Sequence, residues 1–188
     1  RFCQRAANQP DKEFFFIIDE INRGNMSKIF GELLMLIEKD YRGTKATLAY
    51  NGLSFSVPKN LYIIGMMNTA DRSLAMIDYA LRRRFSFFEV EPGFDSEGFI
   101  HYQNGLNNET LNELINKVKD LNREISLDKS LGKGFCIGHS YFCGRDVCTE
   151  EWLHSIVDYD ILPMLSEYWF DDANKLQRWE NIPQGVFR

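Results

Sequence analysis

Two adjacent carboxylates follow a short apolar segment near the start of the sequence. Residues 14–18 are all Phe or Ile, and Asp19 and Glu20 come directly after them. Such a run predicts a strand covered on both faces of a parallel sheet, and parallel sheets bind ligands at the carboxyl edge of their strands. There, Asp19 can hold Mg²⁺ through water, while Glu20 can polarise a water molecule that attacks a phosphate. A strand that ends in an ordinary polar turn would give the same pattern.

A second apolar segment leads to a neutral amide. Residues 61–66 predict another buried strand, and Asn68, Asp71 and Arg72 follow it. An amide beside the carboxylate pair can hydrogen-bond the attacking water or a phosphate oxygen without adding negative charge. Taken alone, an asparagine after a strand is more commonly a turn former.

Three consecutive arginines, Arg82, Arg83 and Arg84, end a helix that is predicted to begin after Ser73 and to cover residues 74–82. Guanidinium groups bind phosphate oxygens in a bidentate manner, and an arginine at a helix end can reach the nucleotide of a neighbouring subunit. Solvated charges, or cations that interact with the helix dipole, would give the same triplet.

The segments between these residues predict the elements that position them. Asn25 predicts the start of a helix that continues with helical apolar spacing to Ile37. Residues 85–90 predict a third strand. Together with a hairpin between the first two strands, this order is typical of half of a doubly wound α/β sheet.

The predicted hairpin turns at Asn51-Gly52, a pair that favours a two-residue loop. Apolar residues alternate with polar ones on both sides of the turn. A two-residue loop would pair Leu48 with Phe55, and Tyr50 with Leu53.

The pattern changes near Pro92, where we predict a boundary. Residues 1–92 would form the later half of an α/β core, and residues 93–188 a mainly helical unit. Apolar residues between 111 and 125 follow one helical stripe, and Thr149 predicts the start of another helix.

Composition excludes several classes of protein. The 188 residues are 44% hydrophobic and 26% charged, which is typical of a soluble globular protein, and the formal charge of −5 argues against a general nucleic-acid-binding surface. No apolar run is long enough to span a membrane. Four separated cysteines favour a reducing cytoplasm over a disulfide framework, and Arg1 in place of Met predicts a piece of a longer chain.

Several segments resemble known motifs. The segment at residues 16–23 resembles the Walker B motif of AAA+ proteins, with the sequence Phe16-Ile17-Ile18-Asp19-Glu20-Ile21-Asn22-Arg23. Two further segments resemble motifs of the McrB family: Met67-Asn68-Thr69-Ala70-Asp71-Arg72-Ser73 and Asp78-Tyr79-Ala80-Leu81-Arg82-Arg83-Arg84-Phe85. Members of this family are the GTP-hydrolysing motor subunits of modified-cytosine-specific restriction systems. Residues 138–142 also resemble a segment of the helical lid of that family.

The resemblance implies a partial AAA+ core, with a hairpin insertion, followed by a mainly helical lid. It implies a ring of subunits that hydrolyses GTP, or ATP, with Mg²⁺, drives DNA translocation and activates a partner nuclease. DNA recognition would belong to a domain outside this sequence. The sequence contains no Gly-x-x-x-x-Gly-Lys-Ser/Thr loop to hold the phosphates, so the 188 residues alone are expected to be inactive.

The resemblance also implies roles for the residues at the predicted strand ends. Asp19 is implied as the Mg²⁺-linked acid and Glu20 as the catalytic base. Asn68 is implied as the sensor of the γ-phosphate, and Asp71 as a residue that helps to place the water.

Four arginines complete the implied site. Arg83 and Arg84 are implied to act as arginine fingers across the ring interface. Arg23 and Arg72 are implied to be nucleotide-binding residues, at the interface or in a relay to the phosphates.

Two alternatives remain open from the sequence. MoxR-like and dynein-related ATPases use the same Walker B and sensor residues to remodel proteins. A different class, a zinc-organised interaction module, could use Cys136, His139, Cys143 and Cys148, although their spacing is not a common zinc pattern.

Overall fold

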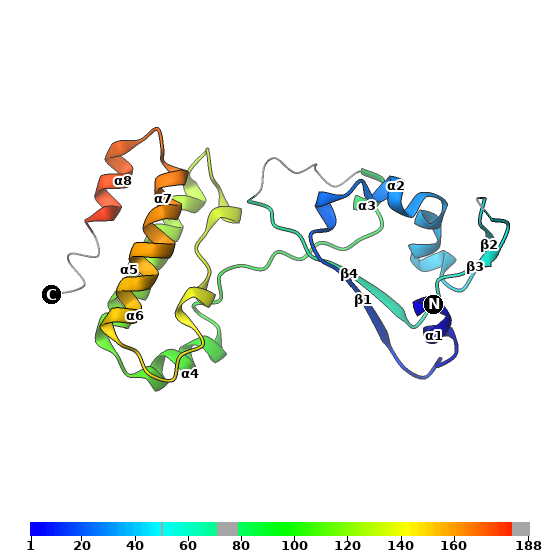
Figure 1. The fold of residues 1–188 in the computed structure, drawn as a ribbon, viewed down its shortest axis with the longest axis horizontal. Coiled ribbons are helices and arrows are strands. Elements are labelled where there is room, and N and C mark those ends of the chain that lie inside the picture. The colour runs from blue at the N-terminus through cyan, green and yellow to red at the C-terminus, as the bar shows by residue number, and fades with distance from the viewer. Residues whose placement is uncertain (50, 71–78, 182–188) are drawn as a thin grey trace. The chain divides into compact units, whose positions relative to one another are not determined.

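The computed structural model describes residues 1–49, 51–70 and 79–181 of the chain. These residues divide into two compact units, the first Arg1–Phe88 and the second Glu89–Arg188 (Figure 1). The predicted boundary near residue 92 lies shortly after this division. Asp71, Arg72 and Ser73 lie outside the described residues.

Two parallel strands form one of the two sheets in the described part of the first unit. The strand β1 (Phe14–Ile18) pairs with β4 (Leu61–Gly65), and the register runs from Phe14 opposite Leu61 to Ile18 opposite Gly65 (Figure 1). Both strands were predicted, and both are confirmed.

The predicted burial of β1 on both faces is wrong. Phe15 and Ile17 are 51% and 57% exposed, and Tyr62 and Ile64 on the same face of β4 are 45% and 43% exposed. The exposure of these four side chains shows that this face of the two-stranded parallel sheet is open to solvent in the described part of the chain.

Short helical segments surround the strands. The helix α1 (Phe2–Ala7) precedes β1, and the next four elements follow it: η1 (Ile21–Arg23), α2 (Met26–Phe30), η2 (Gly31–Ile37) and η3 (Lys39–Tyr41). Asn25 starts α2 as predicted, because its side chain accepts a hydrogen bond from the Lys28 N–H at 2.9 Å.

The prediction of one continuous helix to Ile37 is wrong. Gly31 has a φ of +48° and ends α2, and a 3₁₀ helix follows.

The hairpin exists, but its register differs from the prediction. The strands β2 (Ala46–Thr47) and β3 (Ser54–Phe55) are antiparallel, with Ala46 opposite Phe55. The Leu48 N–H donates to the Leu53 carbonyl at 2.9 Å, so the loop spans residues 49–52 instead of two residues. The Glu32 carboxylate accepts the Ala49 N–H at 2.8 Å, so this loop amide has an acceptor outside the hairpin.

The predicted third strand at residues 85–90 is wrong. The helix α3 (Tyr79–Arg82) is followed by an irregular segment in which Phe88 and Val90 are 90% and 84% exposed. A strand requires a hydrogen-bonding neighbour, and none lies beside this segment among the described residues.

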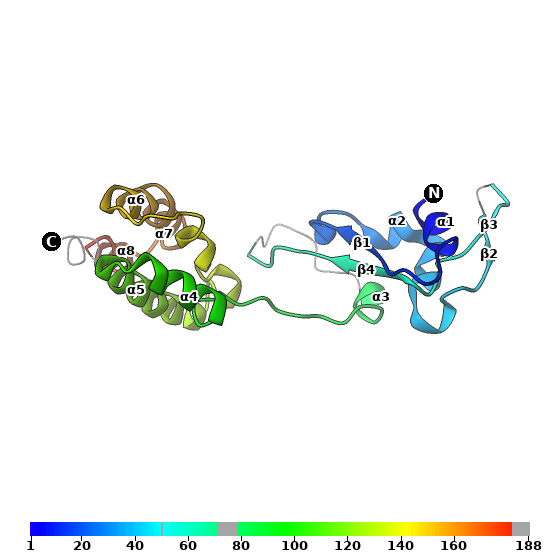
Figure 2. The same cartoon turned by 90° about the horizontal axis from the view of Figure 1, so that it is seen from below.

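The second unit is helical. Its elements are α4 (Glu97–Leu106), α5 (Glu109–Leu127), η4 (Lys133–Phe135), η5 (His139–Phe142), α6 (Glu150–Ser155), the π-helix η6 (Ile156–Ile161), α7 (Leu162–Tyr168) and α8 (Ala173–Glu180). The segments α6, η6 and α7 form one continuous helix, which lies in a separate layer from α5 (Figure 2). Thr149 starts α6 as predicted, because its hydroxyl accepts the Trp152 N–H at 3.2 Å.

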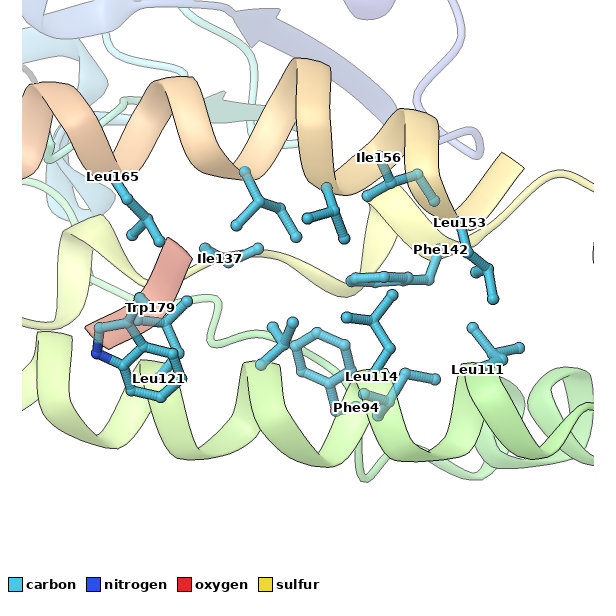
Figure 3. Close-up of a cluster of buried hydrophobic side chains, with 14 of the residues drawn as sticks. Phe94, Leu111, Leu114, Leu121, Ile137, Phe142, Leu153, Ile156, Leu165 and Trp179 are labelled. Atoms are coloured by element: carbon cyan, nitrogen blue, oxygen red, sulfur yellow. The ribbon is translucent and has the colours of Figure 1, made fainter. Parts of the chain in front are cut away.

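A single apolar core fills the space between these two layers. The predicted stripe on α5 is confirmed, because each of its members is buried: Leu111, Leu114, Ile115, Val118, Leu121 and Ile125. Leu153, Ile156 and Leu165 face it from the opposite helix, and Phe142 lies between the two (Figure 3). In the part of the chain that the structure describes, no helix is long and apolar enough to cross a membrane.

The Asp128 carboxylate joins three segments at the end of this core. It accepts hydrogen bonds from Lys175 Nζ at 2.8 Å and Trp169 Nε1 at 3.1 Å, and its other oxygen accepts from the Ser130 hydroxyl at 2.6 Å. The Lys175 ammonium, followed by Ser130 and Trp169, holds the pKa of Asp128 well below its ordinary value of 3.8. A lowered folded-state pKa stabilises the fold above the ordinary value, and this contribution is lost as the pH falls through the lowered value.

We predict that Asp128→Asn lowers the free energy of unfolding by roughly 1–3 kcal/mol at neutral pH, because Lys175 loses its charged acceptor. Between about pH 4 and 2 the variant should lose less of its stability than the parent does, because it lacks the titrating group. Thermal unfolding followed by circular dichroism across this range measures both effects. Asp146→Asn, an exposed acid in the same unit, is the control, and equal acid sensitivity of Asp128→Asn and the parent would contradict the prediction.

Candidate active site

The parallel pairing brings two loops together at the carboxyl edge of the sheet. Beyond the last register pair, the Met66 N–H donates to the Ile18 carbonyl at 2.8 Å, and the Ile21 N–H donates to the Met66 carbonyl at 2.9 Å. The loop that carries Asp19 and Glu20 is therefore fixed beside the chain that leads from Met66 to Asn68.

Glu20 has a left-handed backbone conformation, with a φ of 51° and a ψ of 46°. A residue other than glycine or asparagine is disfavoured in this region, and such strain is common at functional sites. Both the backbone and the carboxylate of Glu20 have partners. The Glu20 N–H donates to Asp19 Oδ1 at 2.9 Å, and Arg23 Nη2 donates to Glu20 Oε1 at 3.4 Å. Arg23 Nε also lies 3.2 Å from the buried Glu20 Oε2, an ion pair without hydrogen-bond geometry.

The turn η1 packs closely onto the end of β4. Ile21 is 6% exposed, and a Cβ atom at Gly65 would lie 2.6 Å from Ile21 Cδ1. This distance is below any ordinary carbon–carbon contact, so a larger residue at position 65 would force the Ile21 side chain to shift.

Asn22 links the two loops through its side chain. It is 9% exposed, and its Nδ2 donates to the Asn68 carbonyl at 3.3 Å. The sequence reasoning assigned no role to Asn22. A polar residue two positions after the acid pair Asp19-Glu20, between Ile21 and the charged Arg23, is the signal that could have directed attention to it.

The Asn68 side chain is exposed and is partly engaged by its own loop. Its Oδ1 accepts the Ala70 N–H at 2.9 Å, as in an Asx turn. The structure thus brings Asp19, Glu20 and Asn68 to one edge of the sheet. Asp71 and Arg72 lie outside the described residues, and nothing is derived for their positions.

The arginines at the end of α3 have different surroundings. Arg83 is exposed and lies over the Tyr79 ring, with its Cζ 4.8 Å from the ring centroid. Arg84 is 21% exposed at its side chain and pairs with Glu38, with 2.6 Å between Nη2 and Oε1. The Arg82 guanidinium lies over Phe87 at 5.8 Å. Arg84 is therefore tied to its own unit, whereas Arg83 faces solvent.

Asp19 suits an indirect role toward a magnesium ion. It is exposed, and one of its oxygens is already occupied by the Glu20 N–H. In the described ranges, no group of three or more His, Cys, Asp or Glu side chains could hold a metal by itself. Mg²⁺ is commonly held by one or two carboxylates together with phosphate oxygens and water. The chemistry of the site therefore fits an ion that arrives with a nucleotide.

The zinc alternative is wrong for the described residues. The four side chains do not gather into a metal-binding group. His139 Nδ1 accepts the Gly93 N–H at 2.9 Å, and Cys136 Sγ donates to the Asn122 carbonyl at 3.5 Å. Burial raises the pKa of the Cys143 and Cys148 thiols, which disfavours the thiolate that zinc requires.

Comparison with known proteins places both units in one family. The AAA domain model of the dynein-related subfamily matches residues 3–85, and the model of the McrB alpha-helical lid domain matches residues 113–177. The EcoKMcrB subunit of the type IV methyl-directed restriction enzyme of Escherichia coli K12 is 53% identical over 192 aligned positions, which cover 96% of the chain and 42% of that protein. The chain belongs to the McrB-like AAA+ family.

A second relative of this McrB-like chain also comes from a restriction enzyme. The YdiS component of the type II restriction enzyme BsuMI of Bacillus subtilis is 33% identical over 101 residues, which are 46% of the chain and 29% of that component. The McrB-like chain thus spans about two fifths of the length of the E. coli relative and less than a third of the B. subtilis one. The predicted family and fold class are confirmed, since the AAA match covers the parallel strands and the lid match lies within the helical unit.

We predict that Gly65→Ala destabilises the first unit by roughly 1–3 kcal/mol, because the new Cβ overlaps Ile21 Cδ1. Ile21→Val removes that atom, so Gly65→Ala should cost less in the Ile21→Val background. A double-mutant cycle measured by thermal unfolding gives the coupling between the two residues. Additive effects would contradict a direct contact between them.

Proposed function

We propose that the chain carries the hydrolysis residues of a nucleoside-triphosphatase motor in a modified-cytosine-specific restriction system. The observation that carries the proposal is the approach of Asp19, Glu20 and Asn68 at the carboxyl edge of two parallel strands, in a McrB-like AAA+ chain. Sheets of this kind bind ligands at that edge.

Glu20 is proposed as the general base. It orients and polarises the water that attacks the γ-phosphate. Arg23 contacts its carboxylate, and the Asp19 side chain accepts its backbone N–H. Arg23 acts in this way as the support of Glu20. Asp19 faces solvent one residue earlier and contributes to binding Mg²⁺ through water. When bound, the ion supplies charge neutralisation between the β- and γ-phosphates.

Asn68 is proposed as the sensor of the γ-phosphate. Its amide supplies a hydrogen bond without negative charge, which favours the developing anion more than another carboxylate would. Asp71 is proposed to help place the water and Arg72 to contact the nucleotide; both proposals rest on the family pattern alone.

Arg83 and Arg84 are proposed as fingers that reach the nucleotide of a neighbouring subunit in a ring. The exposed position of Arg83 supports this role directly. The Glu38 pair gives Arg84 a second role in its own unit, because the ion pair joins the end of α3 to the residue that precedes η3.

Restriction is the proposed biological context. Both relatives are components of restriction enzymes. A motor of this kind would use nucleotide hydrolysis to translocate DNA and to activate a partner nuclease, while DNA recognition belongs to another domain. The dynein-related description of the AAA match favours one alternative, an ATP-driven remodelling protein with the same hydrolysis residues.

We predict that the full-length protein hydrolyses GTP in preference to ATP, and that Glu20→Gln lowers kcat by about 10²- to 10⁴-fold while nucleotide binding is retained. The glutamine preserves size and hydrogen bonding but cannot act as a base. Phosphate release measures turnover, and the binding of fluorescently labelled GTP measures affinity. Preference for ATP would support the remodelling alternative, and full activity of Glu20→Gln would reject Glu20 as the base.

We predict that Arg83→Ala and Arg84→Ala each inactivate the full-length protein, and that mixing either with Glu20→Gln restores part of the turnover. In mixed rings an intact finger from one variant meets an intact base from the other. Glu38→Gln removes the partner of Arg84 but no finger, and it is expected to stay active as the control. Inactive mixtures would mean that the arginines act only within their own subunit.

A further inference from the structure

Asn22 is the buried polar residue of the described ranges. Its neighbour Ile21 is buried beside it, so the amide lies in apolar surroundings. Burial of an amide costs free energy unless its donors and acceptors are satisfied. Here the Nδ2 group has a partner, the Asn68 carbonyl at 3.3 Å, whereas Oδ1 is fully buried and receives no hydrogen bond from the described residues. An apolar side chain would avoid this cost, so the amide has a role beyond packing.

The partner of Asn22 is the backbone of Asn68. A bond to the carbonyl fixes the position of the loop and leaves the Asn68 amide side chain to act on a ligand. The Asn68 side chain meanwhile holds the next part of its loop, since its Oδ1 accepts the Ala70 N–H. Asn22 therefore supports the residue that is proposed to sense the γ-phosphate, without competing for it.

The other residues of η1 contact the remaining parts of the site. Ile21 packs onto Gly65 at the end of β4, and Arg23 holds the Glu20 carboxylate. Asn22 lies between them in the same turn. The same turn thus has a contact to the proposed base on one side and a contact to the proposed sensor on the other. The bond from Asn22 is the side-chain link between η1 and the Asn68 loop.

We infer that Asn22 is a positioning residue that sets the distance between Glu20 and Asn68, an inference that rests on the proposed function. Loss of its donor would let the Asn68 loop move against Glu20 while both residues remain intact. A small misplacement of groups around the reacting phosphate lowers the rate of the chemical step more than it lowers affinity.

The test compares Asn22→Asp and Asn22→Ala in the full-length protein with Asn60→Asp. Aspartate preserves the shape of the side chain but replaces the donor with an acceptor and adds a negative charge, whereas alanine removes the donor without adding charge. Asn60→Asp introduces the same change of charge elsewhere in the unit. Asn60 offers a matched control, because its Nδ2 also donates to backbone carbonyls, those of Ala6, Gln9 and Lys12 at 3.0, 3.0 and 2.8 Å. Asn60 lies directly before β4, at the end of the strand away from the candidate site.

We expect both Asn22 variants to lower kcat for GTP by about 10- to 100-fold, while KM and the Kd for labelled GTP stay within about twofold of the parent values. Asn60→Asp should lower the unfolding temperature and leave kcat within about twofold. Parent-like kcat in both Asn22 variants would overturn the inference. A rise in KM equal to the loss in kcat would also overturn it, as would an equal loss of kcat in Asn60→Asp.

Glu20→Gln, measured in the same assay, separates this inference from the proposed function. If Glu20→Gln is inactive and the Asn22 variants turn over like the parent, only the role of Asn22 fails. If Glu20→Gln itself turns over like the parent, the assignment of the hydrolysis site fails, and the role of Asn22 fails with it.

Discussion

The candidate site depends on the parallel pairing of β1 with β4. Two segments that lie more than forty residues apart in the sequence meet in this pair, from Phe14 opposite Leu61 to Ile18 opposite Gly65. The hydrogen bonds continue beyond the last pair through Met66. Because parallel strands end at the same edge of the sheet, the polar residues that follow the two strands lie near one another. The positions of Asp19, Glu20 and Asn68 all follow from this one pairing.

Features that depend on local sequence could be predicted. The buried stripe of α5 could be predicted because its apolar residues recur at helical spacing and therefore lie on one face of the helix. Asn25 and Thr149 start their helices because a side chain caps an amide only three residues away. The strands at 14–18 and 61–65 were predictable from their continuous apolar composition.

Features that depend on distant partners could not be predicted. Residues 85–90 have strand composition, but strand formation requires a neighbour that composition does not specify. The hairpin has a longer loop than its Asn-Gly pair predicts, and within that loop Glu32, far from the turn in sequence, accepts the Ala49 N–H. The left-handed conformation of Glu20 and the burial of Asn22 arise from contacts between two loops, so no local pattern encodes them. At the site, residue types were therefore predictable and their conformations were not.

The unequal cores of the two units have a consequence for local stability. Among the described residues, the buried apolar side chains of the helical unit form one cluster of 17, whereas those of the first unit form two clusters of four. Segments with fewer buried contacts open at a lower free energy than a well-packed core does. Asp19, Glu20 and Asn68 thus lie in the unit that has fewer buried apolar contacts. Local opening of these loops therefore requires less free energy than opening of the helical unit, whose packing forms one continuous core.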